Sequence, residues 1–477
     1  MKTAEKTNHT DSIQYLPRSR ICGKNPGIVL LLTIIVMLQF FGASSTQALA
    51  SQNIAQLIDT VIVIGNHITH RSVILHEIEL TPGKVVDDSA IDRDRLRLES
   101  LGLFSRVEIS IQNEESRTQL VIKVVELWYI WPGIYISVDN NRPTEKIDYG
   151  FLISHLNFRG RAEDMSITGW TGSSMGGKLR WSVPYVRGNR DWFAKIEGKG
   201  NIEEDPASIT GRKGIETEDL SVQGEFGRRF GLTTRLWLTG GLEARTFNWD
   251  PFNTNGINNN TLYDSRDLLS EIGIYLSHDT RIYRPWPRQG ELSEISVLFE
   301  TSLDDDYTKY IRPNLILSAY RSLNKNLIFA GQVESGMSFG DVPWYRDVLL
   351  DRHSGIRTPL KNEYEGIHYL GFSGEFRGDL LPITYVTFNT FEPLQDYTHD
   401  LKFGISYALF SDYKIVGGEI DNPFDPMINE KQGWDVAYGA GIIFHIPYRE
   451  IIRIEFSRSA RFPELGNIIK LRIGPSF

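Results

Sequence analysis

The sequence has almost no cysteine, no excess of basic charge and no long apolar run after its first fifty residues. Only one of its 477 residues is a cysteine, Cys22, so an intrachain disulfide is impossible and metal sites built on several cysteines are excluded. Lysine and arginine total 51 against 60 aspartates and glutamates, a formal net charge of -9. Because proteins that bind nucleic acid usually carry a basic patch, we predict no nucleic-acid partner.

Residues 1–50 have the pattern of a secretory signal peptide. Basic residues, among them Lys2 and Lys24, precede the apolar stretch Ile28–Phe41, and Ala48-Leu49-Ala50 has the form of a signal-peptidase site. The alternative is an uncleaved membrane anchor, but the stretch is shorter than the roughly 20 residues that span a bilayer. We therefore expect cleavage after Ala50 and export to a bacterial envelope.

Residues 51–128 differ from the rest of the chain because they combine strand and helix periodicity. The predicted elements are a strand, two helices and two strands, at 61–64, 71–80, 90–101, 107–112 and 120–126. This order predicts a small α+β domain.

The same segment resembles a POTRA (polypeptide-transport-associated) domain over its full length. The resemblance rests on turn and core positions of the fold, namely Gly65, Asn66, Gly83, Gly102, Phe104 and Val107. Gly102 permits a left-handed turn, and we expect Phe104 and Val107 to pack between helix and sheet. These are fold residues rather than a binding site. A POTRA domain could bind a polypeptide that adds a strand to its exposed sheet edge.

From Tyr129 onward the chain consists of strand patterns. Sixteen strands are predicted, at 129–139, 147–159, 163–172, 177–187, 191–202, 218–230, 233–247, 267–282, 290–302, 308–322, 326–340, 368–381, 401–413, 434–446, 450–459 and 467–477. Apolar and charged residues alternate, as in a membrane barrel with a polar lumen. A soluble sandwich also alternates, but the export signal, the even strand count and the terminal Phe477 favour a barrel. We predict an all-β transmembrane barrel of 16 antiparallel strands over residues 129–477.

The barrel resembles the bacterial surface antigen superfamily of outer-membrane assembly factors, to which BamA and TamA belong. Three segments carry the resemblance: Asn157-Phe158-Arg159-Gly160-Arg161, Asp279 with Pro285, Pro287 and Gly290, and Ile356-Arg357-Thr358-Pro359. In the third segment the family has Val/Ile-Arg-Gly-Phe/Tyr, in a loop folded back into the barrel. This chain keeps the arginine but lacks the glycine and the aromatic residue, which puts the tight turn of that loop in doubt.

The resemblance implies that Arg357 contacts two acidic residues inside the lumen, Glu375 and Asp412. A guanidinium group that faces two carboxylates can donate paired hydrogen bonds to both. The alternative is that Glu375 and Asp412 are two of many charges in a polar lumen.

By resemblance, the expected function is to assist insertion or translocation of polypeptides at the outer membrane, with the POTRA domain in the periplasm. The barrel would open at a weak seam between its first and last strands, at Pro132, Gly133, Ile136, Leu471, Ile473 and Phe477. Proline and glycine weaken strand pairing, although a bend at the barrel entry explains Pro132 and Gly133 equally well. The expected partners are outer-membrane lipid, unfolded or partner polypeptide and accessory envelope proteins.

Two other functions remain open: a passive pore or lipid-handling channel, and a surface antigen with a structural role only. Catalysis is not predicted, because no phosphate-binding loop, nucleophile elbow or C-x-x-C motif occurs. His67, His70 and His76 lack a fixed carboxylate, and the three aspartates at 304–306 fit a solvated loop better than a calcium site. We therefore expect no metal and no cofactor.

Overall fold

The structure is a computed structural model of the whole chain. The described residues are 57–114, 117–138, 147–204, 215–249, 265–304, 308–346, 348–350, 357, 364–388, 398–418, 433–447, 451–461, 463 and 466–473. The expected signal peptide, residues 1–50, lies outside them, as does Phe477. Among the residues that the structure describes, no helix is long and apolar enough to cross a membrane.

The N-terminal domain has the predicted order of elements. They are β1 (Thr60–Ile64), α2 (Arg71–His76), α3 (Asp88–Ser100), β2 (Phe104–Glu114) and β3 (Arg117–Glu126). The sheet order is β1-β3-β2, with β1 parallel and β2 antiparallel to the central strand β3. Ile74 and Leu98 from the two helices pack on Leu120 and Ile122 of β3 in a fully buried core, which holds the helices on the sheet.

Helix α2 ends at His76, although the sequence pattern predicts a helix to residue 80. The reason is a distant side chain. Asp94 of α3 is fully buried, and its carboxylate accepts the backbone N–H groups of Glu79 and Leu80, each at 2.9 Å. Because the Asp94 carboxylate accepts these two hydrogen bonds, the N–H groups of Glu79 and Leu80 do not bond to carbonyl groups of the preceding turn, and the helix does not continue to residue 80.

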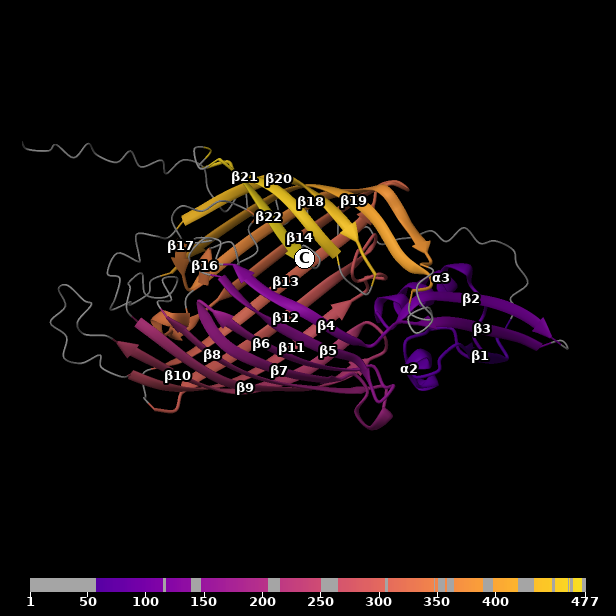
Figure 1. The fold of residues 1–477 in the computed structure, drawn as a ribbon, viewed down its shortest axis with the longest axis horizontal. Coiled ribbons are helices and arrows are strands. Elements are labelled where there is room, and N and C mark those ends of the chain that lie inside the picture. The colour runs from indigo at the N-terminus through magenta and orange to yellow at the C-terminus, as the bar shows by residue number, and fades with distance from the viewer. Residues whose placement is uncertain are drawn as a thin grey trace, which may run out of the picture. The chain divides into compact units, whose positions relative to one another are not determined.

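Most of the described residues after the N-terminal domain form one closed barrel, in which the last strand, β22, is next to the first, β4, in the strand order. Figure 1 shows its strands side by side as a tilted wall. Within the described residues the barrel strands are β4 (Ile130–Val138), β5 (Ile147–Phe158), β6 (Glu163–Gly172), β7 (Ser174–Val183), β8 (Trp192–Glu204), β9 (Ile215–Phe230), β10 (Thr234–Trp249), β11 (Ser265–Asp279), β12 (Gly290–Ser302), β13 (Lys309–Ser322), β14 (Leu327–Met337), β15 (Phe339–Asp341), β18 (His368–Val386), β19 (Leu401–Gly417), β20 (Gly433–His445), β21 (Ile451–Ser459) and β22 (Asn467–Ile473).

Of these 17 strands, β14 and β15 are two segments of one barrel strand. Both pair with β13 in one continuous register, Asn314 opposite Gly336 and Ile311 opposite Phe339. A short break at Ser338 separates them. The described barrel therefore has 16 strands when β14 and β15 are counted as one, which confirms the predicted strand number.

Several details of the barrel differ from the sequence-based expectation. Strands β18 and β19 end at Val386 and Gly417 rather than at 381 and 413. Strand β7 ends at Val183 rather than 187, because Pro184 precedes a short 3-10 turn, Val186–Gly188. Strand β11 ends at Asp279 rather than 282, because the Asp279 carboxylate accepts the N–H of Arg281 at 3.1 Å and starts a turn. The small hairpin of β16 (Val348–Leu350) and β17 (Tyr364–Gly366) was not predicted.

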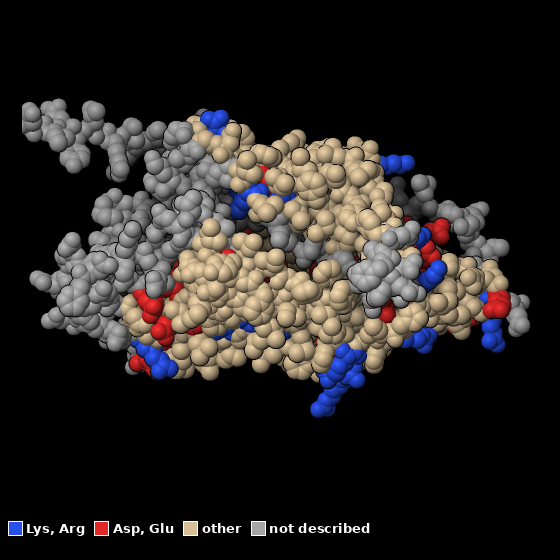
Figure 2. Space-filling view, viewed as in Figure 1, with Lys and Arg blue, Asp and Glu red and all other residues tan. Residues whose placement is uncertain are grey.

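Apolar side chains cover the outside of the wall and charged ones line the inside. Phe376 and Phe456 are each 46% exposed, whereas Glu375 and Glu455, their neighbours in sequence, are fully buried. Figure 2 shows the outer surface as a broad uncharged area, with most of the visible red and blue atoms near its two ends. This arrangement is that of a barrel in hydrocarbon and the reverse of a soluble sandwich.

Two glycines of the N-terminal domain allow backbone strain to be separated from steric crowding. Gly65 has a φ of 90° and Gly83 a φ of 85°, so a side chain at either position is strained by about 1–3 kcal/mol. Only at Gly65 would a Cβ also lie 2.0 Å from the Val124 carbonyl oxygen, whereas the space at Gly83 is open. Gly65→Ala should therefore reduce hydrogen-exchange protection of β1 and β3 much more than Gly83→Ala does. Equal losses would show that the close approach to Val124 is unimportant.

Candidate functional site

Six charged side chains meet on the inner face of the barrel, and we call them the lumen ion cluster. They come from β18, β19, β21 and one loop residue, and they are Arg357, Glu375, Arg377, Asp412, Arg453 and Glu455. None is more than 2% exposed. Three guanidinium groups balance three carboxylates, so the cluster is neutral when every member is ionised. Neutrality is needed because an unpaired charge in such a place is strongly destabilising.

Arg357 is held by carboxylates in more than one direction. Its Nε and Nη2 donate to Oδ2 and Oδ1 of Asp412 at 2.7 and 2.5 Å, the paired geometry of a strong ion pair. Its Nη1 donates to Glu375 and, at 3.3 Å, to Glu455. Its Cζ lies 3.6 Å from the ring centroid of Phe410. The structure thus brings together Arg357, Glu375 and Asp412, the three residues selected from the sequence.

The other three members were missed in the sequence. Arg377 Nε donates to Glu375 Oε2 at 2.5 Å, and Arg453 Nη2 donates to Glu375 Oε1 at 2.9 Å. Arg453 Nε also donates to Glu455 Oε1 at 3.0 Å. The signal was present in the strand alternation. Arg377 follows Glu375 by two residues and Arg453 precedes Glu455 by two, so each pair shares the inward face.

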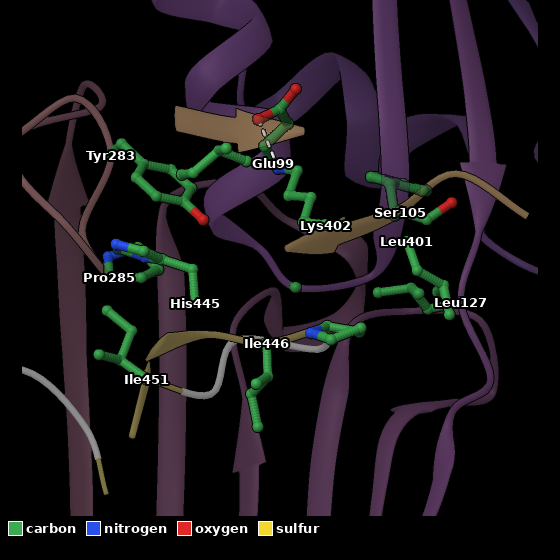
Figure 3. Close-up of a pocket in the computed structure, with 14 residues that line it drawn as sticks. Glu99, Ser105, Leu127, Tyr283, Pro285, Leu401, Lys402, His445, Ile446 and Ile451 are labelled. Carbon is green, nitrogen blue, oxygen red and sulfur yellow. Dashed lines mark hydrogen bonds and ion pairs between the residues drawn. The ribbon is translucent and has the colours of Figure 1, made fainter. Parts of the chain in front are cut away.

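Contacts also join the N-terminal domain to the barrel. Lys402 Nζ of β19 donates to Glu99 Oε2 of α3 at 2.6 Å, and the Tyr385 hydroxyl donates to Glu99 Oε1 at 3.3 Å. Figure 3 shows Glu99 and Lys402 pointing toward each other beside a cavity that Tyr283 and His445 also line. The cavity volume is about 30 Å³, enough for about one water molecule.

A second buried contact lies at the end of α2. The Glu77 carboxylate accepts hydrogen bonds from the Tyr185 hydroxyl and from Arg229 Nη1, each at 2.7 Å. Burial alone would raise the pKa of Glu77, but the charge and hydrogen bond of Arg229 outweigh it and hold the pKa below its ordinary value. Glu77 is therefore ionised at neutral pH, and it compensates the charge of Arg229, which is itself buried.

The remaining selected residues lie where the fold requires them. In the N-terminal domain, Gly65, Gly83 and Gly102 have positive φ angles, Asn66 Nδ2 donates to the Thr69 carbonyl at 3.0 Å, and Phe104 and Val107 are buried. On the barrel, Pro132 pairs opposite Ile153 and Gly133 opposite Leu152 in the register of β4 with β5. Ile136 and Leu471 are exposed on the outer surface, and Ile473 ends β22.

Within the described part of the chain, no group of three or more His, Cys, Asp or Glu side chains could hold a metal ion. Of the aspartates at 304–306, only Asp304 is described. One serine and histidine pair does occur in the lumen: Ser406 Oγ lies 2.8 Å from His445 Nε2 and donates to Asp379 at 3.0 Å. Here the carboxylate contacts the serine instead of orienting the histidine, which is not the arrangement that activates a nucleophile.

Removing Arg357 should take from Asp412 its paired guanidinium group and leave Glu375 with Arg377 and Arg453 only. Breaking a buried ion pair typically costs about 3 to 5 kcal/mol. We expect Arg357→Ala to lower the free energy of unfolding by an amount in this range, with smaller losses for Glu375→Ala and Asp412→Ala. Urea unfolding of the barrel in lipid would measure each loss.

A double-mutant cycle tests the contact itself. The Arg357→Ala and Glu375→Ala losses should be non-additive by about 0.5 to 3 kcal/mol. As a control, Arg245→Ala should add independently to Glu375→Ala, because Arg245 pairs with Asp219 and Glu243 instead. Additive losses for Arg357 and Glu375 would mean that the proposed contact does not stabilise the protein.

The contact at Glu77 should weaken in acid. The pKa of Glu77 is lower in the docked state, so that state binds fewer protons and loses stability as the pH falls below the ordinary value of 4.5 toward the lowered one. We expect hydrogen exchange in α2 to accelerate there more in the native chain than in Glu77→Gln, which cannot titrate. The same acid response in both proteins would exclude Glu77 as the titrating group.

Comparison with known proteins agrees with this architecture. Residues 57–127 match the POTRA family model, described as a surface antigen variable number repeat. Similar solved structures are BamA from Haemophilus ducreyi lacking POTRA domains 1–3 (14% identity, 89% of this chain and 85% of that chain, TM-score 0.50), CdiB from Escherichia coli (10%, 95% and 98%, 0.51) and CdiB from Acinetobacter baumannii (11%, 88% and 74%, 0.51). Curated protein sequences give no significant match. The chain therefore combines a POTRA domain with a barrel of the fold found in BamA and CdiB.

Proposed function

We propose that this protein spans the bacterial outer membrane and assists the insertion or translocation of polypeptides, with its POTRA domain in the periplasm. The observation that carries the proposal is the combination in one chain of a POTRA domain and a 16-stranded barrel with an apolar outer surface. A POTRA domain offers a surface for polypeptide, and the barrel offers a route into or across the membrane.

The POTRA sheet supplies the receiving surface. Strand β2 lies at one edge of the sheet order β1-β3-β2, and its second half is largely exposed. An edge strand has backbone N–H and C=O groups available on one side, and an extended polypeptide can pair with them. We infer that β2 receives the incoming chain.

The barrel would open between its first and last strands, β4 and β22. The outward side chains there are among the most exposed of the described barrel: Ile134 is 84% exposed, Ile469 69% and Leu471 68%. Elsewhere on the wall Phe376 is 46% exposed and Leu220 of β9 67%, so only Ile134 stands clearly apart. The exposure of Ile134 supports a seam with little side-chain packing over this part of β4.

The lumen ion cluster would keep the barrel closed to free diffusion while the seam opens. Its arginine and carboxylate groups lie inside the barrel but are almost inaccessible to solvent. A wide passive pore would leave such charges hydrated. Their burial favours assisted transport over a passive pore or lipid-handling channel.

Cysteine pairs across the seam test the proposal on a Cys22→Ser background. The pairs join Tyr135, Ile136 or Ser137 to Leu471, Arg472 or Ile473. Oxidised pairs should abolish growth of a strain depleted of the native protein, and reduction should restore it, because the seam can no longer part. Assembly of outer-membrane barrel proteins in the same cells measures the activity.

A matched control links the last strand to its permanent neighbour. Ile454 and Leu471 lie opposite each other in the register of β21 with β22, so a disulfide there constrains β22 without closing the seam. This variant should support growth in both redox states. Full growth with an oxidised seam pair would reject lateral opening and favour the passive channel.

A further inference from the structure

The turn between β11 and β12, residues 280–289, is a rigid element. The Asp279 carboxylate pairs with Arg281 Nε at 2.9 Å and with Arg284 Nε at 3.0 Å, which fixes the first half of the turn. Pro285 and Pro287 restrict the second half. Gly290 closes it with a φ of 107°, where a Cβ would lie 2.6 Å from the Thr280 carbonyl oxygen. A force applied at one side of this turn is therefore transmitted to the other.

One side of the turn contacts the POTRA domain. Ser100 is the last residue of α3, and its hydroxyl accepts the backbone N–H of Arg284 at 3.3 Å and lies 3.3 Å from the Ile282 carbonyl oxygen. The Tyr283 ring centroid lies 5.3 Å from Lys402 Nζ, the ammonium group that binds Glu99 of the same helix. Figure 3 shows Tyr283 in this position. The end of α3 is thus attached to the turn.

The other side of the turn inserts Trp286 into the barrel. Trp286 is 2% exposed and packs on Ala408, Ile443 and Ile451 of three neighbouring strands. The Arg377 guanidinium lies over the Trp286 ring, with Cζ 4.8 Å from its centroid. A planar guanidinium stacked on an aromatic face loses much of its rotational freedom.

Arg377 in turn belongs to the lumen ion cluster. Its Nε bonds Oε2 of Glu375, while Oε1 of Glu375 accepts from Arg357. If Arg377 rotated away, Glu375 would lose the only one of its described arginine partners that binds Oε2, and Arg453 would remain on Oε1, the oxygen that also faces Arg357. The contacts from Ser100 to Arg357 form one continuous series.

We propose that Trp286 is a positioning residue through which the POTRA domain controls how firmly Arg357 is held in the lumen. The inference rests on the proposed function: a polypeptide that displaces α3 would move the turn, release Arg377 and loosen the hold of Glu375 on Arg357. The cluster then responds to events at the POTRA domain without direct contact with the polypeptide.

The test measures how firmly Arg357 is held in the full chain without any polypeptide client. The backbone N–H of Arg357 donates to Asp412 Oδ2 at 3.2 Å, and deuterium labelling of this amide is timed in lipid. Trp286→Leu should speed labelling roughly tenfold. Trp286→Phe keeps an aromatic face for Arg377 and should restore most of the native rate. Ser100→Ala should speed labelling and add little in the Trp286→Leu background, because both act through the turn.

The control is the same substitution at another lumen aromatic. The Trp237 ring packs on Tyr275 and Phe193, with centroids 4.9 and 6.1 Å away, and neither partner belongs to the turn or the cluster. Trp237→Leu should therefore label at the native rate. Native labelling of a folded Trp286→Leu protein, or independent effects of Ser100→Ala and Trp286→Leu, would overturn the proposal. If labelling responds as expected but oxidised seam pairs still support growth, the coupling stands and the proposed transport function fails.

Discussion

The structure depends on one electrostatic requirement: an arginine enclosed inside a barrel must be surrounded by carboxylates. Arg357 meets this requirement only if Glu375 and Asp412 lie near each other on adjacent strands. The pairing of β18 with β19 provides that, because Asp412 lies opposite Ser373, two residues from Glu375 on the same face. The third carboxylate, Glu455, comes from β21. A slip of one residue in any of these strands would turn its charged side chain outward, toward lipid. The ion cluster therefore fixes the strand register as well as the position of Arg357.

The same requirement explains the contacts between the POTRA domain and the barrel. Glu77 and Glu99 are both buried in the POTRA domain, and each faces a cation of the barrel, Arg229 or Lys402. Each POTRA carboxylate is thus compensated by a partner on a strand far away in sequence. These ion pairs stabilise the docking of the POTRA domain on the barrel, and the β11–β12 turn contacts the domain at Ser100.

Much of the fold could be predicted because strand alternation and turn glycines are local signals. The 16 barrel strands and the order of elements in the POTRA domain follow from such patterns. The end of α2 could not, because it depends on Asp94, which lies beyond the helix in sequence. The partner of Glu77 is 152 residues away, and no pattern in a single sequence pairs it with Arg229. Three members of the ion cluster were visible as inward charges, but their mutual contacts required the three-dimensional arrangement.

The central claim is that the Arg357 guanidinium lies between the Asp412 and Glu375 carboxylates. Solid-state magnetic resonance of the protein in lipid measures this directly, through dipolar coupling between labelled guanidinium nitrogens and carboxylate carbons. The account predicts strong Arg357 coupling to Asp412, at nitrogen to oxygen distances of 2.5 and 2.7 Å, and to Glu375, with the Arg357 signals assigned by their loss in Arg357→Lys. Absence of coupling to either carboxylate in the folded barrel would contradict it.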